Sequence, residues 1–395
     1  MEVHLADSRP KRNALTVAVV WVLATIASLP FLLKWHAPTL AESAGLPIAV
    51  GWLIVCGVCY GIYHLEARRL PSRWAVIVTL FIIILTATTN NLHHNLVDYS
   101  RDAFPGVANT SWQAGLEDAV IQWSRFDVPH TYRFLPNSIV RWMQLAGLDF
   151  ADARDFYRDL VGLLLFYAIY CFARLYTGVC GALVAIILVG LVTPISYEHY
   201  VGQLTDPLSH LSFVLAFIFL ATGNFPLLLS TLLIGSLAKE TVLALAGYYV
   251  LFCRGDSGYN AKAPTILFTT GVIYMAVRWL VLHGPMGYSE ISGTTLQHVS
   301  RNVGDSRWPL AFVLTAGAFS PILILNWHNT PGQLRRLALY LLPVLFVSSM
   351  FFSWLAESRN FMPVVVVLAV VAGYHLEKLA GVEPLTSNQT PPKSR

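Results

Sequence analysis

The stretch "GSLAKETVLALAGYYVLF" (235–252) ends a run that is apolar from Phe225 onward except for one adjacent pair of charges, Lys239 and Glu240. A charge at the centre of a membrane helix costs roughly 2.5–3.5 kcal/mol on insertion scales. The run 225–252 is therefore either one long tilted helix with a buried charge pair or two short helices that meet at that pair. The second interpretation places both charges at the membrane surface, and it predicts a short or re-entrant hairpin.

The composition of the whole chain indicates a membrane protein. Its 395 residues are 55% hydrophobic and 12% charged, whereas a soluble globular protein carries about 25% charged residues. The apolar runs are continuous rather than alternating, which predicts helices, each needing roughly 20 apolar residues to cross a bilayer. We expect an all-α integral membrane protein with about 10–12 transmembrane helices, counting the hairpin. The candidate spans beside the hairpin are 14–33, 46–65, 74–90, 160–176, 178–194, 207–222, 263–282, 309–325, 337–353 and 361–376.

The distribution of basic residues gives an expected orientation. With the hairpin and a cytoplasmic N-terminus, one set of segments holds most of the Lys and Arg, as cytoplasmic loops do. This predicts a cytoplasmic N-terminus (1–13), a single multi-span domain (14–376) with a large extracytoplasmic helical loop (91–159), and a disordered cytoplasmic tail (377–395). The expected cytoplasmic basic residues are Arg9, Lys11, Arg12, Arg68, Arg69, Arg73, Arg174, Arg254, Lys262, Arg335, Arg336, Lys378, Lys393 and Arg395.

Acidic and histidine side chains collect at the opposite, outer ends of the spans. Polar groups that converge at membrane depth predict a functional cavity, although ordinary interfacial capping is the alternative. In the loop 91–159, "SWQAGLEDAVIQWS" carries one apolar helical face with two tryptophans, and "DFADARDFYRDL" begins as a capped helix that leads into the next span. The outer groups at span ends are His93, His94, Asp98, Asp102, Glu198, His199, Asp206, Lys239, Glu240, Glu357 and Arg359.

Three short motifs, taken in order, resemble the C-type glycosyltransferase superfamily. They are "YRFLP" (132–136), "LAKET" (237–241) and "ESRNFMPVVVV" (357–367). The set is similar to bacterial members related to mannosyl- and arabinosyltransferases. The resemblance implies a multi-helix enzyme in the bacterial inner membrane with a cavity facing outward. Its donor would be a sugar on a polyprenyl phosphate carrier, and its acceptor a glycan, lipid or protein.

The chemistry of inverting sugar transfer assigns roles to individual residues. One carboxylate must take the acceptor proton while a phosphate leaves the anomeric carbon. Asp98 is the first choice for this base because it follows the third span closely, and Asp102 lies one helical turn further on. The family carries an acidic pair in the first large loop, whereas these two residues are four apart, so the choice between them stays open.

The departing lipid phosphate needs positive charge, which Arg and Lys supply. Lys239 and Arg359 are the candidates, and Arg133 is a third. Glu240 either holds Lys239 or pairs with Arg359. Tyr132 and Glu357 belong to the matching motifs and complete the expected substrate-binding set.

No cofactor is firmly predicted, and a divalent metal is the one candidate. His94 and Asp98 are four apart and could share a metal on one helix face. The chain contains no nucleotide-binding glycine motif, which fits a donor carried on lipid. Nothing predicts a nucleic-acid partner. A transporter or lipid flippase, and a non-catalytic membrane assembly protein, remain as alternatives.

Overall fold

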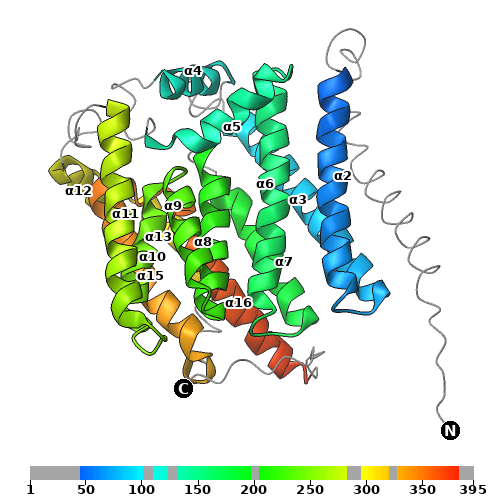
Figure 1. The fold of residues 1–395 in the computed structure, drawn as a ribbon, viewed down its shortest axis with the longest axis vertical. Helices are drawn as coiled ribbons and strands as arrows, with labels where there is room; N and C mark the ends of the chain where they lie inside the picture. The colour runs from blue at the N-terminus through cyan, green and yellow to red at the C-terminus, as the bar shows by residue number, and fades with distance from the viewer. Residues whose placement is uncertain are drawn as a thin grey trace.

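The computed structural model describes residues 45–100, 110–122, 132–196, 204–282, 295–319 and 327–381; for residues 45–50, 52, 91–100, 110–113, 195–196, 280–282 and 311 it describes the backbone alone. This part of the chain forms helices and turns without a strand (Figure 1). The α-helices are α2 (Gly45–Ala67), α3 (Ser72–Ser100), α4 (Thr110–Ile121), α5 (Phe134–Leu145), α6 (Phe150–Ala173), α7 (Val179–Ser196), α8 (Thr205–Thr222), α9 (Phe225–Ser236), α10 (Ala244–Phe252), α11 (Tyr259–Leu282), α12 (Thr295–Gly304), α13 (Arg307–Leu314), α15 (Gly332–Phe352) and α16 (Met362–Leu379). Short 3-10 helices are η3 (Glu240–Leu243), η5 (Gly317–Phe319), η6 (Trp327–Asn329) and η7 (Ser358–Phe361).

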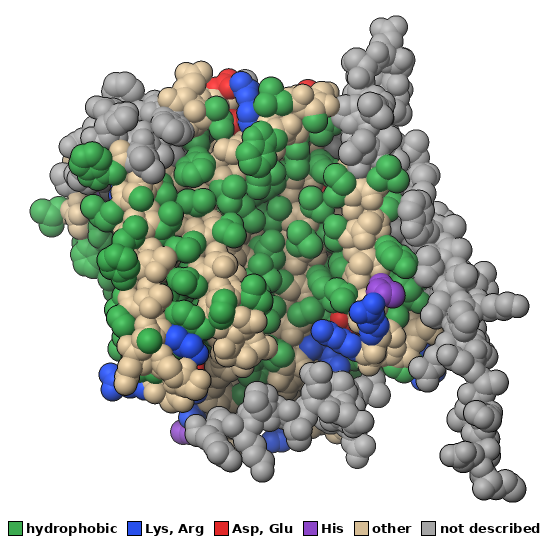
Figure 2. Space-filling view, in the orientation of Figure 1, with side chains coloured by type: hydrophobic (Ala, Val, Ile, Leu, Met, Phe, Trp, Pro, Cys, Tyr) green, Lys and Arg blue, Asp and Glu red, His purple; other side chains and the backbone are tan. Residues whose placement is uncertain are grey.

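The expected all-α membrane fold is confirmed. Five helices of the described ranges are long and apolar enough to cross a bilayer, and four shorter apolar helices accompany them. Large apolar side chains stand exposed on the outer helices, among them Leu53 on α2 and Phe268 and Trp279 on α11. Figure 2 shows such side chains covering the middle of one face. Lipid is the surrounding that makes this surface favourable. The first predicted span, 14–33, lies outside the described residues, so the total of 10–12 spans stays a prediction.

The hairpin at 225–252 is confirmed. Gly223, in the left-handed conformation, ends α8, and the Asn224 side chain accepts a hydrogen bond from the Leu227 backbone amide at the start of α9. The chain then passes through Lys239 and η3 into α10. The Phe225 ring at the beginning of α9 lies 5.4 Å from the Tyr249 ring near the end of α10. The two short helices therefore run in opposite directions, with Lys239 and Glu240 at the turn between them.

Helix α16 forms the centre of the bundle, and every residue from Met362 to Gly373 is buried. A helix that is apolar all round is typical of such a position. It crosses α7 where two glycines meet: a Cβ on Gly181 would lie 2.9 Å from the Gly373 carbonyl oxygen. Small residues at this point let the two backbones approach closely. Below the crossing, the Glu377 carboxylate accepts hydrogen bonds from the backbone amides of Gly178 (2.6 Å) and Gly181 (3.2 Å).

Two expected boundaries were wrong. The tail does not begin at 377, because Glu377 is helical and caps the start of α7. The span predicted at 309–325 is not a continuous helix: α13 ends at Leu314, and Gly317, a poor helix former, opens the turn η5. The third span ends at Asn90, as expected, and α3 continues beyond it as a helix to Ser100.

The described parts of the loop between α3 and α6, residues 110–122 and 132–149, are largely helical, as expected. They contain α4 and α5, which lie across one end of the bundle (Figure 1). The Asp149 side chain accepts the Asp152 backbone amide at 2.8 Å, so the predicted cap of α6 is present. A carboxylate at this position also suits the positive end of the helix dipole.

The bundle has two chemically different ends. At one end, the Tyr176 hydroxyl donates to Gln333 and Glu377 binds Gly178, which brings the α6–α7 turn, the start of α15 and the end of α16 together. We call this the basic end, because the turns and helix ends there carry Arg68, Arg69, Arg73, Arg174, Arg254, Lys262, Arg335, Arg336 and Lys378. Figure 2 shows Lys and Arg side chains collected along this lower edge. The hairpin turn at Lys239 lies at the opposite end, which we call the pocket end.

Candidate functional site

The hairpin turn presents Lys239 toward α8. Lys239 is extended (φ −161°, ψ 123°) and its backbone amide bonds the Gly235 carbonyl at 2.9 Å, so the helix stops there. Gly235 has no room for a side chain, since a Cβ would lie 2.7 Å from the Cβ of Ser212 on α8. The missing side chain therefore lets the turn pack directly on α8, and the lysine reaches the first turn of that helix.

Asp206 is the centre of a buried charge network. Its Oδ1 accepts from Lys239 Nζ at 3.1 Å, and its Oδ2 accepts from Arg359 Nη1. Asp206 is fully buried, and the two cations are 6% and 3% exposed. Its place in the first turn of α8 adds the favourable field of the helix N-terminus. One carboxylate thus joins α8, the hairpin turn and η7.

Neighbouring polar groups complete this network. Lys239 Nζ also donates to Asn360 Oδ1 at 2.8 Å, and His210 Nε2 donates to the Arg359 carbonyl oxygen at 3.1 Å. The Glu357 carboxylate accepts from Arg359 Nη2 at 2.9 Å and Nε at 3.3 Å. Charge-assisted hydrogen bonds of this kind fix the direction of the guanidinium as well as its charge.

A second ion pair fastens α5 to the hairpin. Arg133 donates from Nε to Glu240 Oε2 at 3.1 Å and from Nη2 to Oε1 at 2.8 Å. The Leu135 backbone amide also bonds the Leu237 carbonyl at 3.2 Å. We expected Glu240 to hold Lys239 or to pair with Arg359. The ion pair that the structure describes for Glu240 is instead with Arg133, and Lys239 and Arg359 both pair with Asp206.

Arg278 on α11 differs from the other cations. Its guanidinium lies 3.5 Å from the centre of the Tyr274 ring and 4.4 Å from that of Tyr132, and it is 7% exposed. Within the described part of the chain it contacts no carboxylate. Two aromatic faces hold it in place by cation–π attraction. The predicted substrate residue Tyr132 thus stands behind the pocket wall and supports Arg278.

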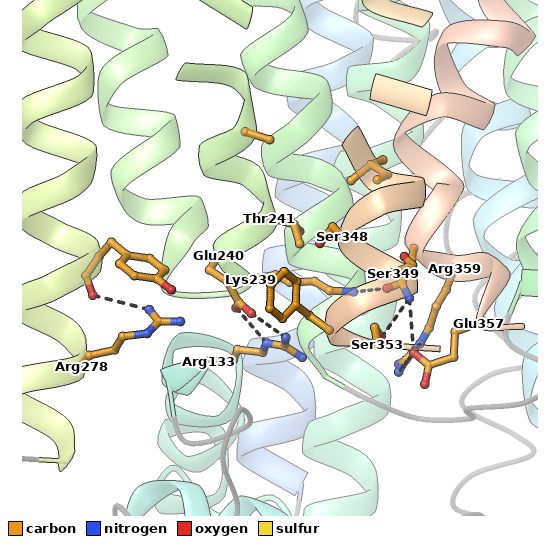
Figure 3. Close-up of a pocket in the computed structure, with 15 residues that line it drawn as sticks. Arg133, Lys239, Glu240, Thr241, Arg278, Ser348, Ser349, Ser353, Glu357 and Arg359 are labelled. Atoms are coloured by element: carbon orange, nitrogen blue, oxygen red, sulfur yellow. Dashed lines mark hydrogen bonds and ion pairs between the residues drawn. The ribbon is translucent and has the colours of Figure 1, made fainter. Parts of the chain in front are cut away.

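These groups surround one cavity of about 290 Å³ (Figure 3). Among the described side chains, its wall contains the four cations Arg133, Lys239, Arg278 and Arg359 and two carboxylates, Glu240 and Glu357; a third carboxylate, Asp206, lies behind the wall. On α15, Leu345, Ser348, Ser349 and Phe352 follow i, i+3, i+4, i+7 spacing and so share one helix face toward the cavity. Thr241, Ala244, Tyr274, Ser353 and Asn360 complete the lining.

The cavity brings together five of the predicted binding residues from three distant motifs: Arg133, Lys239, Glu240, Glu357 and Arg359. Asp98 and His94 fall in the last turns of α3, where only the backbone is described, and Asp102 lies outside the described residues. The metal hypothesis for His94 and Asp98 therefore stays a prediction. Among side chains that the structure does describe, no group of three or more His, Cys, Asp or Glu is arranged to hold a metal ion.

Three important residues were not predicted as part of the site. Asp206 had been noted at a span end without a partner, and Asn360 had no signal beyond its place in the third motif. Arg278 had the clearest signal, since an arginine within the apolar stretch 263–282 is costly unless it has a role.

Comparison of the chain with protein-family models, with curated proteins and with solved structures gives no significant match.

Proposed function

We propose that this chain is a membrane glycosyltransferase that moves a sugar from a polyprenyl phosphate carrier to an acceptor at the outer face of the membrane. The observation that carries the proposal is the cavity at the pocket end, whose wall includes Arg278, a cation that contacts no carboxylate in the described chain. A buried cation without a carboxylate partner favours an anionic ligand over a neutral or cationic one. The resemblance of the three motifs supplies the identity of that anion.

The expected orientation follows from the basic end. Lys and Arg concentrate in loops on the cytoplasmic side of membrane proteins. If the basic end faces the cytoplasm, the pocket end faces outward, and both expected cytoplasmic termini agree with this direction. A lipid-linked donor can then enter from the outer leaflet with its phosphate at the depth of the hairpin turn.

The cavity divides the donor into two chemical parts. The phosphate would lie against Arg278 and Lys239, and the sugar hydroxyls against the hydroxyl and amide groups of Ser349, Ser353 and Asn360. In the reaction, the acceptor oxygen forms a bond to the anomeric carbon, the bond from that carbon to the phosphate oxygen breaks, and a carboxylate takes the acceptor proton. The positive wall stabilises the charge on the departing lipid phosphate.

Asp98 remains the proposed base, with Asp102 as its alternative. Helix α3 starts at the basic end and runs to Ser100, so its last turn, with Asp98, reaches the pocket end. Glu240 is less suited to this role, since Arg133 engages both of its oxygens, and Glu357 accepts from Arg359 through Oε2.

The test is a transfer assay on the full chain in lipid nanodiscs. Lipids that copurify are identified by mass spectrometry, and a matching polyprenyl phosphate sugar is supplied as donor. Asp98→Asn should abolish transfer and leave donor binding and folding intact, whereas Asp118→Asn, at an exposed position on α4, should leave transfer unchanged. Full transfer by Asp98→Asn would move the base to Asp102, and absence of bound anionic lipid in the wild-type protein would contradict the donor class.

A flippase or transporter is the second candidate, because the broken helix pair α9–α10 at a buried charged site is also typical of transporters. The two functions differ in product. An enzyme leaves a free polyprenyl phosphate and a glycosylated acceptor, whereas a flippase leaves the sugar-lipid bond intact and changes only its leaflet.

A further inference from the structure

Helix α12, which no motif covers, places one fully buried polar side chain against the end of α15. Asn302 Nδ2 lies within hydrogen-bond distance of three backbone carbonyl oxygens, those of Ser349 (3.2 Å), Met350 (3.0 Å) and Ser353 (3.1 Å). Its Oδ1 accepts from the Leu355 backbone amide at 2.9 Å. The amide therefore uses its donors and its acceptor on one short segment.

This contact solves a local problem at the end of α15. The last carbonyls of any helix have no intrahelical partner. Many helices end in a left-handed glycine that turns the chain back over these carbonyls, but here Ser353 is extended (φ −149°, ψ −154°) and the chain leaves directly. The Ser349 carbonyl already accepts the Ser353 amide at 3.1 Å, so the main effect of Asn302 is to supply, from another helix, a donor for the Met350 and Ser353 carbonyls.

A second contact holds the same segment from the side. Trp354 Nε1 donates to Asp305 Oδ2 at 2.7 Å. The Trp354 ring also has the Arg301 guanidinium 4.9 Å and the Arg307 guanidinium 4.7 Å from its centre. Residues 353–355 are therefore fixed by α12 and by the turn that follows it.

Residues 353–355, which we call the held segment, lead directly into the cavity wall. Ser353 lines the cavity, and its Oγ accepts from Asn360 Nδ2 at 3.3 Å. The Glu357 amide bonds the Trp354 carbonyl at 3.1 Å, and the Asn360 amide bonds the Glu357 carbonyl at 3.0 Å. A shift at 353–355 would be passed through these short turns to Glu357 and Arg359, which face the proposed phosphate site.

We propose that Asn302 is a positioning residue of this site: by capping α15 and binding the Leu355 amide, it sets the place of the wall formed by Ser353, Glu357 and Arg359. Asn302 does not line the cavity and touches no ligand there. Its importance for sugar transfer rests on the proposed function, whereas its control of the wall does not.

The experiment measures how readily a thiol reagent reaches the cavity wall, with no substrate present. Ser353→Cys on the held wall and Thr241→Cys on the hairpin side serve as separate reporters, each labelled by a small water-soluble thiol reagent in nanodiscs. Each labelling rate is expressed relative to the labelling rate of the same cysteine reporter in a protein that keeps Asn302, measured at the same pH. Because the hydrogen bonds lost are worth roughly a factor of 5–30, Asn302→Asp at neutral pH should raise Ser353→Cys labelling by about 5-fold or more, with Thr241→Cys changed by less than about 2-fold.

Acid provides the decisive comparison. A protonated carboxyl carries one O–H donor and one acceptor oxygen, so it can replace the amide, and burial favours this neutral form. At about pH 5.5 the Ser353→Cys labelling rate in Asn302→Asp should therefore return toward the rate measured with Asn302 intact. In Asn302→Leu, which has neither the donor nor the acceptor, the labelling rate should stay raised. Asn329→Asp, on exposed η6 near the basic end, is the matched control and should change neither reporter.

Equal increases at both reporters would mean general loosening and would overturn the proposal, as would an unchanged Ser353→Cys rate or identical pH behaviour of the two variants. If a donor is identified, Asn302→Asp should lower kcat at neutral pH with recovery in acid. Failure to find any sugar transfer would leave the labelling result standing, so the two proposals fail separately.

Discussion

The two ends of this bundle use charge in different ways. At the basic end, cations such as Arg68, Arg254 and Arg336 stand exposed, and the carboxylates of Glu66 and Glu377 bind neutral partners, namely tyrosine hydroxyls and backbone amides. At the pocket end, the four wall cations are at most 8% exposed. Lys239 and Arg359 share Asp206, Arg133 pairs with Glu240, and Arg278 lies against aromatic rings.

The difference indicates what each set of charges does. Exposed cations at a membrane surface cost little and contribute to orientation. Buried cations have a high desolvation cost, so their presence needs partners or a ligand. Asp206 provides partners for two of them, whereas Arg278 depends on aromatic faces, and a ligand's charge would complete its surroundings.

Removing the centre of the pocket-end network should have the largest effect. Asp206→Ala leaves Lys239 and Arg359 buried without their shared carboxylate, and we expect a loss of about 3–5 kcal/mol in the free energy of unfolding. Chemical unfolding in mixed micelles would measure it. Asp118→Ala breaks the exposed pair with Arg141 (3.2 Å) and should cost less than about 1 kcal/mol. Similar losses in the two variants would remove the distinction between the buried and exposed charges.

Arg278→Gln should affect binding rather than stability. The variant removes a cation that has no carboxylate partner in the described structure, so the unfolding free energy should stay equal or rise. Affinity for a polyprenyl phosphate should fall roughly 10–100-fold, the value of a hydrogen bond to a charged group. Native mass spectrometry of nanodiscs titrated with the lipid would measure this. Arg335→Gln at the basic end should leave the affinity unchanged, and an equal fall there would point to nonspecific attraction.

A change at the α7–α16 crossing should destabilise the bundle without altering the site. A Cβ added by Gly373→Ala would overlap the Gly181 backbone, and such overpacking costs about 1–3 kcal/mol. Thermal unfolding in detergent would show the loss, while lipid affinity of the folded fraction stays the same. Gly57→Ala on α2 meets no atom within 4 Å and should instead stabilise by about 0.5–1 kcal/mol. Stabilisation by Gly373→Ala would contradict the close crossing.

The smallest effect concerns acid and Asp305, beside the held segment. Hydrogen bonds from the Arg307 side chain, then from its backbone amide and from Trp354, lower the pKa of Asp305 from 3.8 to about 2. A carboxyl group with a lowered pKa stabilises the folded protein at pH values above its ordinary pKa. This stabilisation is lost as the pH falls from the ordinary pKa through about 2. Tryptophan fluorescence of the wild type should therefore change in this window, with the change absent in Asp305→Asn. A transition centred near the ordinary value would show that these bonds are weak.

Several of these features could be predicted from the sequence because their causes are local. Two charges within an otherwise apolar run indicated the hairpin turn at Lys239 and Glu240, since the cost of burying them in lipid is large. Asp149 preceding a helical pattern indicated the cap of α6. The three motifs indicated residues that the structure then places around one cavity, although their chemical role stays a prediction.

The remaining features depend on partners far away in the chain. Nothing near Glu240 indicates that Arg133, 107 residues earlier, binds it. Asp206 looked like an ordinary acid at a helix start, and its two cations lie 33 and 153 residues later. Asn302 lies in a short polar segment whose importance depends on the carbonyls of another helix. Hydropathy gave the end of the apolar span near Asn90 but not the end of helix α3 at Ser100, because it measures affinity for lipid rather than helix formation.

The shared carboxylate of Asp206 has a consequence for biosynthesis. Asp206 and Lys239 are synthesised well before Arg359, which follows Asp206 by 153 residues and Lys239 by 120 (359 − 239). Until Arg359 is made, the Asp206 carboxylate has only Lys239 as a cationic partner within this network. Glu357 and Arg359 are then added together, so the net charge of the network stays the same, while Asp206 gains its second cationic partner and the cavity gains the wall formed by η7.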